Sequence, residues 1–137
     1  MKFSSKVEKC GLSPMRKFHP YAVAAEAKGK KIYHLNIGQP DVETPACFME
    51  AIRNYENKVI AYAESGGITD LQDAVSDYFK TYGMNIGREN MIVTTGGSEA
   101  LNMTFLSILN EGDEALIPEP FYTNYHTFAT SAGGKVV

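Results

Sequence analysis

The most informative run in the chain is Thr94-Thr95-Gly96-Gly97-Ser98-Glu99-Ala100-Leu101. It follows residues 91–93, which have the composition of a strand, and leads into residues 100–106, which have the composition of a helix. Glycine lets the backbone approach an anion closely, and the first N–H groups of a helix point at such a ligand. Ser98 can add a side-chain hydroxyl. The run therefore predicts a turn that binds a phosphate group.

Strands and helices alternate from this run to the last residue. The pattern predicts strands at 91–95, 114–117 and 135–137, with helices at 98–109 and 122–131. Alternation of this kind is typical of a parallel sheet covered by helices. The predicted fold class is therefore α/β.

The N-terminal part of the chain is predicted from its prolines, its glycines and the spacing of its apolar residues. It is expected to contain an irregular arm, three helices and a short strand. These elements are the arm at 1–13, a helix from His19 to Lys28 ended by Gly29, a strand at 32–36, a helix after Thr44-Pro45 with Thr44 as its N-cap, and a helix over 71–82 ended by Gly83.

Composition and charge argue against several kinds of partner. The 137 residues carry a net charge of −3, which gives no support to a nucleic-acid or anionic-membrane surface. No apolar run reaches the length of about 20 residues that a membrane span needs, and the N-terminus lacks the apolar core of a signal peptide. Cys10 and Cys47 are too few and too far apart to predict a metal site or a disulfide framework. We therefore expect a cytoplasmic protein without metal, nucleic-acid or membrane partners.

Four segments carry a resemblance to a known family. They are Asn36-Ile37-Gly38-Gln39-Pro40-Asp41, Ala61-Tyr62-Ala63-Glu64-Ser65-Gly66-Gly67-Ile68, the run from Gly96 to Leu101, and Ile117-Pro118-Glu119-Pro120-Phe121-Tyr122-Thr123-Asn124-Tyr125. In this order and spacing they resemble the N-terminal third of the fold-type I aminotransferases, the aspartate aminotransferase superfamily of classes I and II. The resemblance extends from about Pro14 to Val137.

The resemblance implies an incomplete fold-type I pyridoxal-phosphate transferase. Residues 1–13 would be an N-terminal arm, 14–45 a small-domain segment with the substrate loop, and 46–137 the first part of the large cofactor-binding domain. In that family, later strands lie between the first strand of the large-domain sheet and its second and third. The strand at 91–95 would then lack its neighbours, so we expect the chain on its own to be unstable.

The resemblance also implies which residues bind pyridoxal phosphate. Gly97, Ser98 and Glu99 match the turn whose backbone N–H groups hold the cofactor phosphate. Tyr122 matches the aromatic residue that stacks on the pyridine ring. Tyr62 matches a tyrosine that reaches the cofactor phosphate of the partner subunit, which implies a homodimer with a shared active site.

Substrate binding is implied at a second place. Ile37 and Gly38 match the loop near the α-carboxylate of the substrate, an α-amino acid or a 2-oxo acid. The lysine that binds the cofactor covalently, the aspartate that pairs with the pyridine nitrogen and the arginine that grips the carboxylate lie further along the chain in this family. No catalytic role is therefore carried onto residues 1–137.

Several alternatives stay open. The same N-terminal motifs occur in pyridoxal-phosphate lyases and in enzymes similar to aminocyclopropane-carboxylate synthase. A truncated module without catalytic activity is a further possibility. An unrelated phosphate-binding α/β domain is disfavoured, because no Walker lysine follows the glycines and their spacing is not that of a dinucleotide site.

Overall fold

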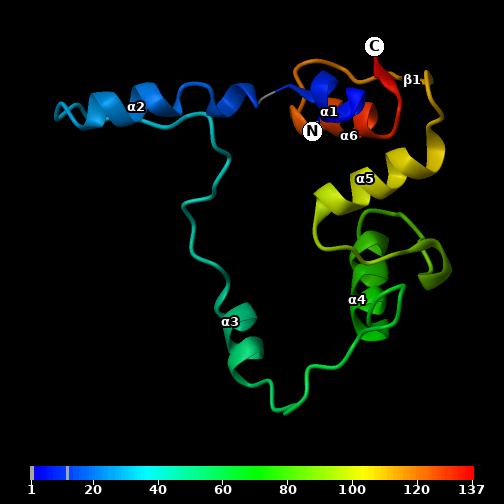
Figure 1. Cartoon of the computed structure of the whole chain (residues 1–137). Helices are drawn as coiled ribbons and strands as arrows, with labels where there is room; N and C mark the ends of the chain where they lie inside the picture. The colour runs from blue at the N-terminus through cyan, green and yellow to red at the C-terminus, as the bar shows by residue number, and fades with distance from the viewer. Residues whose placement is uncertain (1, 12) are drawn as a thin grey trace. The chain divides into compact units, whose positions relative to one another are not determined.

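The computed structural model describes residues 2–11 and 13–137 (Figure 1). The chain divides into two compact units, the first formed by Met1–Asn36 with Thr94–Val137 and the second by Ile37–Val93. These boundaries differ from the division at residues 13 and 45 that the family resemblance implies. The division implied by the resemblance refers to the domains of a whole fold-type I transferase, and it stays a prediction.

The first unit contains most of the secondary structure that was predicted around the phosphate turn. Its elements are α1 (Ser5–Cys10), η1 (Pro14–Arg16), α2 (His19–Glu26), α5 (Gly97–Ile108), β1 (Glu114–Ala115), α6 (Asn124–Ser131) and β2 (Lys135–Val136). The second unit contains α3 (Ala46–Arg53), α4 (Thr69–Lys80) and η2 (Arg88–Asn90).

The strand–helix–strand prediction is confirmed at the C-terminal end of the first unit. β1 pairs with β2 in parallel, with Glu114 opposite Lys135 and Ala115 opposite Val136. The crossover helix α6 packs on β2, and α5 and α1 both pack on α6. Figure 1 shows α1 beside α6, close to the C-terminus. A parallel pair needs a crossover of this kind, and α6 supplies it.

The strands predicted at 32–36 and 91–95 are wrong for the described chain, because neither segment is a strand and each ends in a bend, at Asn36 and Thr95. A strand exists only where its backbone pairs with a neighbour. The N–H of Val93 donates instead to the carbonyl of Gly66, at 2.9 Å. In the other segment, the side chain of Asn36 donates to the carbonyl of Met15, at 2.9 Å.

The irregular arm predicted at 1–13 is also wrong, because residues Ser5–Cys10 form the helix α1. The hydroxyl of Ser4 accepts a hydrogen bond from the N–H of Val7 and caps the helix. The thiol of Cys10 lies 3.9 Å from the carbonyl oxygen of Thr127 on α6. A helix of six residues is too short to show a clear apolar period, so the Ser4 cap and the packing on α6 stabilise it instead.

The other helices lie close to their predicted positions. α4 ends before Gly83, which has a φ of 75° as a helix-ending glycine requires. α2 ends at Glu26, and Gly29 closes the turn after it with a φ of 77°. The prediction of Thr44 as an N-cap is wrong. Pro45 takes the N-cap position of α3 and contributes no side-chain hydrogen bond.

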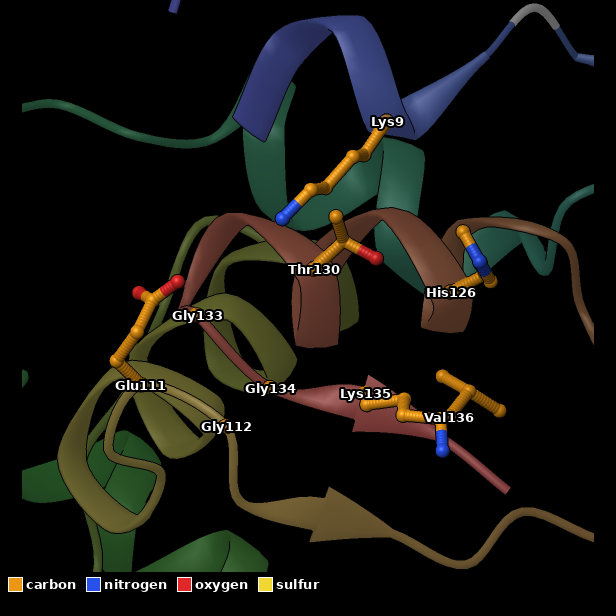
Figure 2. A pocket seen from close by; sticks show the side chains of 9 residues that line it. All are labelled: Lys9, Glu111, Gly112, His126, Thr130, Gly133, Gly134, Lys135 and Val136. Atoms are coloured by element: carbon orange, nitrogen blue, oxygen red, sulfur yellow. The ribbon is translucent and has the colours of Figure 1, made fainter. Parts of the chain in front are cut away.

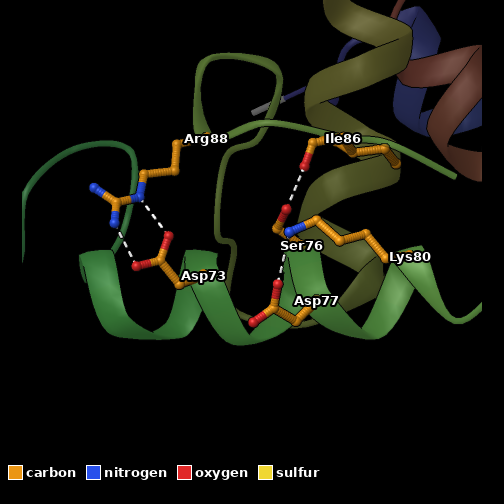
Figure 3. A network of polar contacts seen from close by, with 6 residues as sticks. All are labelled: Asp73, Ser76, Asp77, Lys80, Ile86 and Arg88. Atoms are coloured by element: carbon orange, nitrogen blue, oxygen red, sulfur yellow. Dashed lines mark hydrogen bonds and ion pairs between the residues drawn. The ribbon is translucent and has the colours of Figure 1, made fainter.

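Polar contacts hold the segment after α4 against that helix in the second unit (Figure 3). Asp73 and Arg88 form a bidentate ion pair, and the hydroxyl of Ser76 donates to the carbonyl of Ile86 at 2.7 Å. The hydrogen bonds from Arg88 lower the pKa of the Asp73 carboxyl, and the same contact raises the pKa of Arg88. The pair therefore favours the charged state of both groups.

The hydrophobic core is small. Among the described residues, the hydrophobic side chains that are buried are those of Ala129 and Ala132. Large apolar side chains remain exposed on the helices, for example Phe48 and Ile52 on α3 and Leu106 on α5. Burial of so little apolar surface does not offset the conformational entropy lost on folding. The geometry therefore supports the expectation that these residues need further surfaces to cover them.

We predict that residues 1–137, purified alone as a monomer, show no cooperative thermal transition. The measurement is far-ultraviolet circular dichroism against temperature, with a concentration series to detect association. A sharp, concentration-independent melt would contradict the prediction.

We predict that Asp73→Asn loosens the segment after α4 in the folded protein at neutral pH but not in acid. The lowered pKa of Asp73 means that its stabilising effect is present above the unfolded pKa of about 3.9 and is lost as pH falls through the folded value. The effect should be small, because both side chains are about half exposed. The measurement is the amide hydrogen-exchange rate of residues 84–90, expressed as the ratio of the rate in the variant to the rate in the wild type from pH 6 to pH 3. A ratio that is independent of pH would contradict the assignment.

Candidate active site

The N-terminus of α5 is open to a ligand. Gly96 occupies the N-cap position with a φ of 82°, a conformation that favours glycine, and it has no side chain with which to cap the helix. A Cβ added at Gly96 or Gly97 would meet nothing within 4 Å, so the space in front of the turn is free. The N–H groups of Gly97, Ser98 and Glu99 belong to the first turn, where the helix offers them no carbonyl acceptor.

Side chains of the turn hold its backbone rather than the helix N–H groups. The carboxylate of Glu99 accepts a hydrogen bond from the N–H of Thr95, and the hydroxyl of Thr94 donates to the carbonyl of Gly96 at 3.0 Å. Glu99 thus acts much like the acidic residue of a capping box, displaced by one position. Its carboxylate is engaged, so its own contribution to anion binding is limited to its backbone N–H. The sequence alone predicts Glu99 at this turn but not this side-chain role.

The donor set at this turn fits an anion. Three N–H groups of a twelve-residue helix and the exposed hydroxyl of Ser98 lie at the positive end of the helix dipole. A phosphate dianion takes several hydrogen bonds and favours this end of a helix. The turn therefore provides what a phosphate-binding site needs.

The ring of Tyr122 is held by its neighbours at the start of α6. Its hydroxyl accepts a hydrogen bond from the side chain of Asn124 at 2.8 Å, and its ring meets Tyr125 edge-on with centroids 5.7 Å apart. Phe121 stacks on Tyr125 with centroids 6.3 Å apart. Tyr122 keeps 45% of its surface exposed, so it can offer a ring to a flat ligand.

Thr123 is a polar residue that the sequence analysis did not single out. It lines a shallow depression of about 520 Å³ together with Glu119, Pro120 and Phe121. Its hydroxyl is buried and has no hydrogen-bond partner within the described residues. The sequence could have drawn attention to Thr123 only by its position directly after Tyr122. Packing, not local sequence, decides whether its hydroxyl is buried.

The remaining predicted site residues belong to the second unit. Tyr62 is fully exposed on the loop before α4, and Ile37 is 63% exposed. Gly38 has open space around it, because an added Cβ would meet nothing within 4 Å. Gly97, Ser98, Glu99 and Tyr122 belong to the first unit.

A second hollow, of about 550 Å³, lies in the first unit and contains none of the predicted site residues (Figure 2). Lys9 of α1, His126 of α6 and Lys135 of β2 are among the residues that line it. Within residues 2–11 and 13–137, no group of metal-binding side chains is assembled. None of the helices in this part of the chain is both long and apolar enough to cross a membrane.

Residues 30–137 match the family described as aminotransferase class I and II. The chain belongs to this family. The resemblance drawn from the four motifs is therefore confirmed, and so is the fold class, an incomplete fold-type I transferase of the α/β class. Members of this aminotransferase family use pyridoxal phosphate.

Curated relatives of this aminotransferase chain carry transaminase names. A (5-formylfuran-3-yl)methyl phosphate transaminase of Methanocaldococcus jannaschii is 38% identical over 114 residues, which are 82% of this chain and 31% of the relative. An aspartate aminotransferase of Pyrococcus horikoshii is 37% identical over 113 residues, which are 81% of this chain and 29% of the relative. The chain spans about a third of the length of these relatives.

Solved aminotransferase structures have the same fold in the corresponding region. A Thermus thermophilus aspartate aminotransferase double mutant superposes with a TM-score of 0.90 at 32% identity, over 100% of this chain and 36% of the other. An alanine aminotransferase of Pyrococcus furiosus gives a TM-score of 0.86 at 30% identity, over 99% and 36%. The α5 turn of this chain, with its free N–H groups and the Ser98 hydroxyl, fits the phosphate of the family's cofactor.

We predict that Ser98→Ala weakens the binding of pyridoxal phosphate by about tenfold or more, because a hydrogen bond to a charged group contributes about 1.5–3 kcal/mol. Equilibrium titration of the folded protein with the cofactor measures this. Pyridoxal, which lacks the phosphate, should bind the variant and the wild type equally.

Ser107→Ala is the matched control. Ser107 lies on the same helix, and its hydroxyl donates to the carbonyl of Met103 at 2.8 Å. It should leave the affinity for pyridoxal phosphate unchanged. Equal losses in the two variants would show that Ser98 does not contact the phosphate.

Proposed function

We propose that this chain supplies the phosphate- and ring-binding part of an aminotransferase that uses pyridoxal 5'-phosphate. The enzyme moves an amino group between an α-amino acid and a 2-oxo acid, in the cytoplasm and in amino acid metabolism. The observation that carries the proposal is the open N-terminus of α5, with Gly96 as its N-cap, in a chain that belongs to the class I and II family.

The first unit would hold the phosphate. The N–H groups of Gly97, Ser98 and Glu99 donate to its oxygens, and the hydroxyl of Ser98 adds another donor. The hydrogen bond from Thr95 to Glu99 keeps the turn in shape before the ligand arrives. Preorganisation of this kind means that little conformational entropy is lost on binding.

Tyr122 would hold the pyridine ring. Pyridoxal phosphate supplies an electron-withdrawing ring that stabilises negative charge at the α-carbon of the substrate. Asn124 and Tyr125 restrain Tyr122 at its hydroxyl and its edge, so that its face stays available for stacking. A ring held in a fixed orientation by Tyr122 would help to decide which bond of the substrate is broken.

The second unit carries the other residues for which the family resemblance implies a role. The backbone at Ile37 and Gly38 would lie against the α-carboxylate of the substrate, where the lack of a side chain at Gly38 leaves room. Tyr62 would donate its hydroxyl to the cofactor phosphate of the partner subunit in a homodimer. Its complete exposure supports a role outside its own unit. In the complete enzyme, residues 14–45 would belong to the small domain and 46–137 to the large domain.

A lyase of the same superfamily is the competing function. Relatives named as aspartate aminotransferase, asparagine–oxo-acid transaminase and aspartate/prephenate aminotransferase, at 34–37% identity, favour transamination. The names differ in the amino donor, so the donor has to be found by experiment.

The test is product analysis on the enzyme loaded with pyridoxal phosphate. A panel of amino acids that includes aspartate and asparagine is offered together with 2-oxoglutarate. We predict formation of glutamate and of the 2-oxo acid of the donor in equal amounts, without release of ammonia. Release of ammonia without glutamate would instead establish the lyase.

A further inference from the structure

Gln72 is a buried polar residue that the proposed function does not yet use. It lies on α4, and only 8% of its surface is exposed. Its side-chain amide donates to the carbonyl of Gly66 at 3.0 Å and to the carbonyl of Met91 at 3.4 Å. A buried amide needs hydrogen-bond partners, and these two carbonyls provide them. Because the carbonyls belong to different loops, the Gln72 side chain joins the two loops.

The corner at Gly66 and Gly67 is the point where these loops meet. The carbonyl of Gly66 also accepts a hydrogen bond from the N–H of Val93 at 2.9 Å. Gly67 has a φ of 113°, and a Cβ added there would lie 2.6 Å from the Cβ of Val93. The N–H of Gly67 donates to the carbonyl of Glu64 at 2.9 Å, which closes the turn. The corner is therefore fixed by hydrogen bonds and by close packing of Gly67 against the side chain of Val93.

Tyr62 lies four residues before Gly66, on the free side of this corner. Its side chain is fully exposed, so packing within its unit does not place it. Its neighbour Ile60 is exposed as well. The position of Tyr62 thus depends on the backbone anchor at Gly66, and Gln72 provides the side-chain part of that anchor.

We propose that Gln72 is a positioning residue for the cofactor: by donating to Gly66 and Met91, it holds the loop of residues 61–65 so that Tyr62 meets the cofactor phosphate of the partner subunit. This inference rests on the proposed function. Gln72 itself does not touch the cofactor. Its effect passes through Tyr62.

A double-mutant cycle tests this route. Gln72→Met keeps the length of the side chain and removes its donors, and Tyr62→Phe removes the hydroxyl. Each single variant of the dimeric protein should bind pyridoxal phosphate about tenfold more weakly. The double variant should bind no more weakly than Tyr62→Phe within about twofold, because Gln72 acts only through that hydroxyl. Pyridoxal should bind all of them equally.

Ser76→Ala is the matched control. Ser76 lies one turn further along α4, is buried to a similar degree, and donates to the carbonyl of Ile86 at 2.7 Å. Its loss should lower stability without changing the affinity for pyridoxal phosphate. If Gln72→Met does not fold, Gln72→Asn gives the same comparison, because its amide is one methylene too short to reach both carbonyls.

The outcomes separate the two proposals. Independent, additive losses from Gln72→Met and Tyr62→Phe would overturn the positioning role while leaving the proposed function intact. An equal loss of affinity in Ser76→Ala would overturn it as well. If Tyr62→Phe binds pyridoxal phosphate as the wild type does, the role of Tyr62 fails, and the inference about Gln72 fails with it. Failure of the wild type to bind the cofactor would overturn the proposed function itself.

Discussion

Backbone N–H and C=O groups need hydrogen-bond partners, and the supply of partners shapes this chain more than any other constraint. Where two strands run side by side, at β1 and β2, a parallel ladder forms across the α6 crossover. Where a segment has no strand beside it, as at 91–95, its backbone bonds to a loop instead: the N–H of Val93 donates to the carbonyl of Gly66, which is distant in the sequence. At the start of α5 the N–H groups of the first turn have no acceptor within the helix, and the proposed phosphate site uses these groups.

The turn at the start of α5 and the corner at Gly66 and Gly67 use glycine in two different ways. At Gly96 the backbone has a positive φ and open space in front of it, which suits the approach of an anion. At Gly67 the backbone also has a positive φ, but the space is filled by Val93. One glycine keeps a binding site accessible, and the other lets two segments pack without a side chain between them. Both glycines belong to a Gly-Gly pair in a turn, so only their surroundings distinguish them.

The small core and the exposed apolar helices agree with an active site that is completed by other surfaces. Ala129 and Ala132 contribute little apolar area, while α3 and α5 present large side chains to solvent. Tyr62 is exposed in the same way, on a loop whose base is well anchored. An exposed side chain on an anchored loop is what the proposed contact of Tyr62 with a neighbouring subunit would require.

Sequence reasoning reached the family, the fold class and the longer helices, because these depend on local information. The period of apolar residues in α4, the glycines that end helices, and the order of the four motifs are all properties of neighbouring residues. The turn proposed to bind phosphate was predicted in the same way, because its two glycines and the start of α5 are adjacent in the chain.

What only the tertiary structure decided depends on residues that are distant in the sequence. Residues 5–10 form a helix because α6 lies beside them, and 91–95 form no strand because no second strand pairs with them. The hydrogen bonds of the Glu99 carboxylate and the Gln72 amide, and the lack of a partner for the Thr123 hydroxyl within the described residues, likewise depend on which groups folding brings near them. A sequence specifies which groups can form hydrogen bonds, whereas folding determines which of them come within reach of one another.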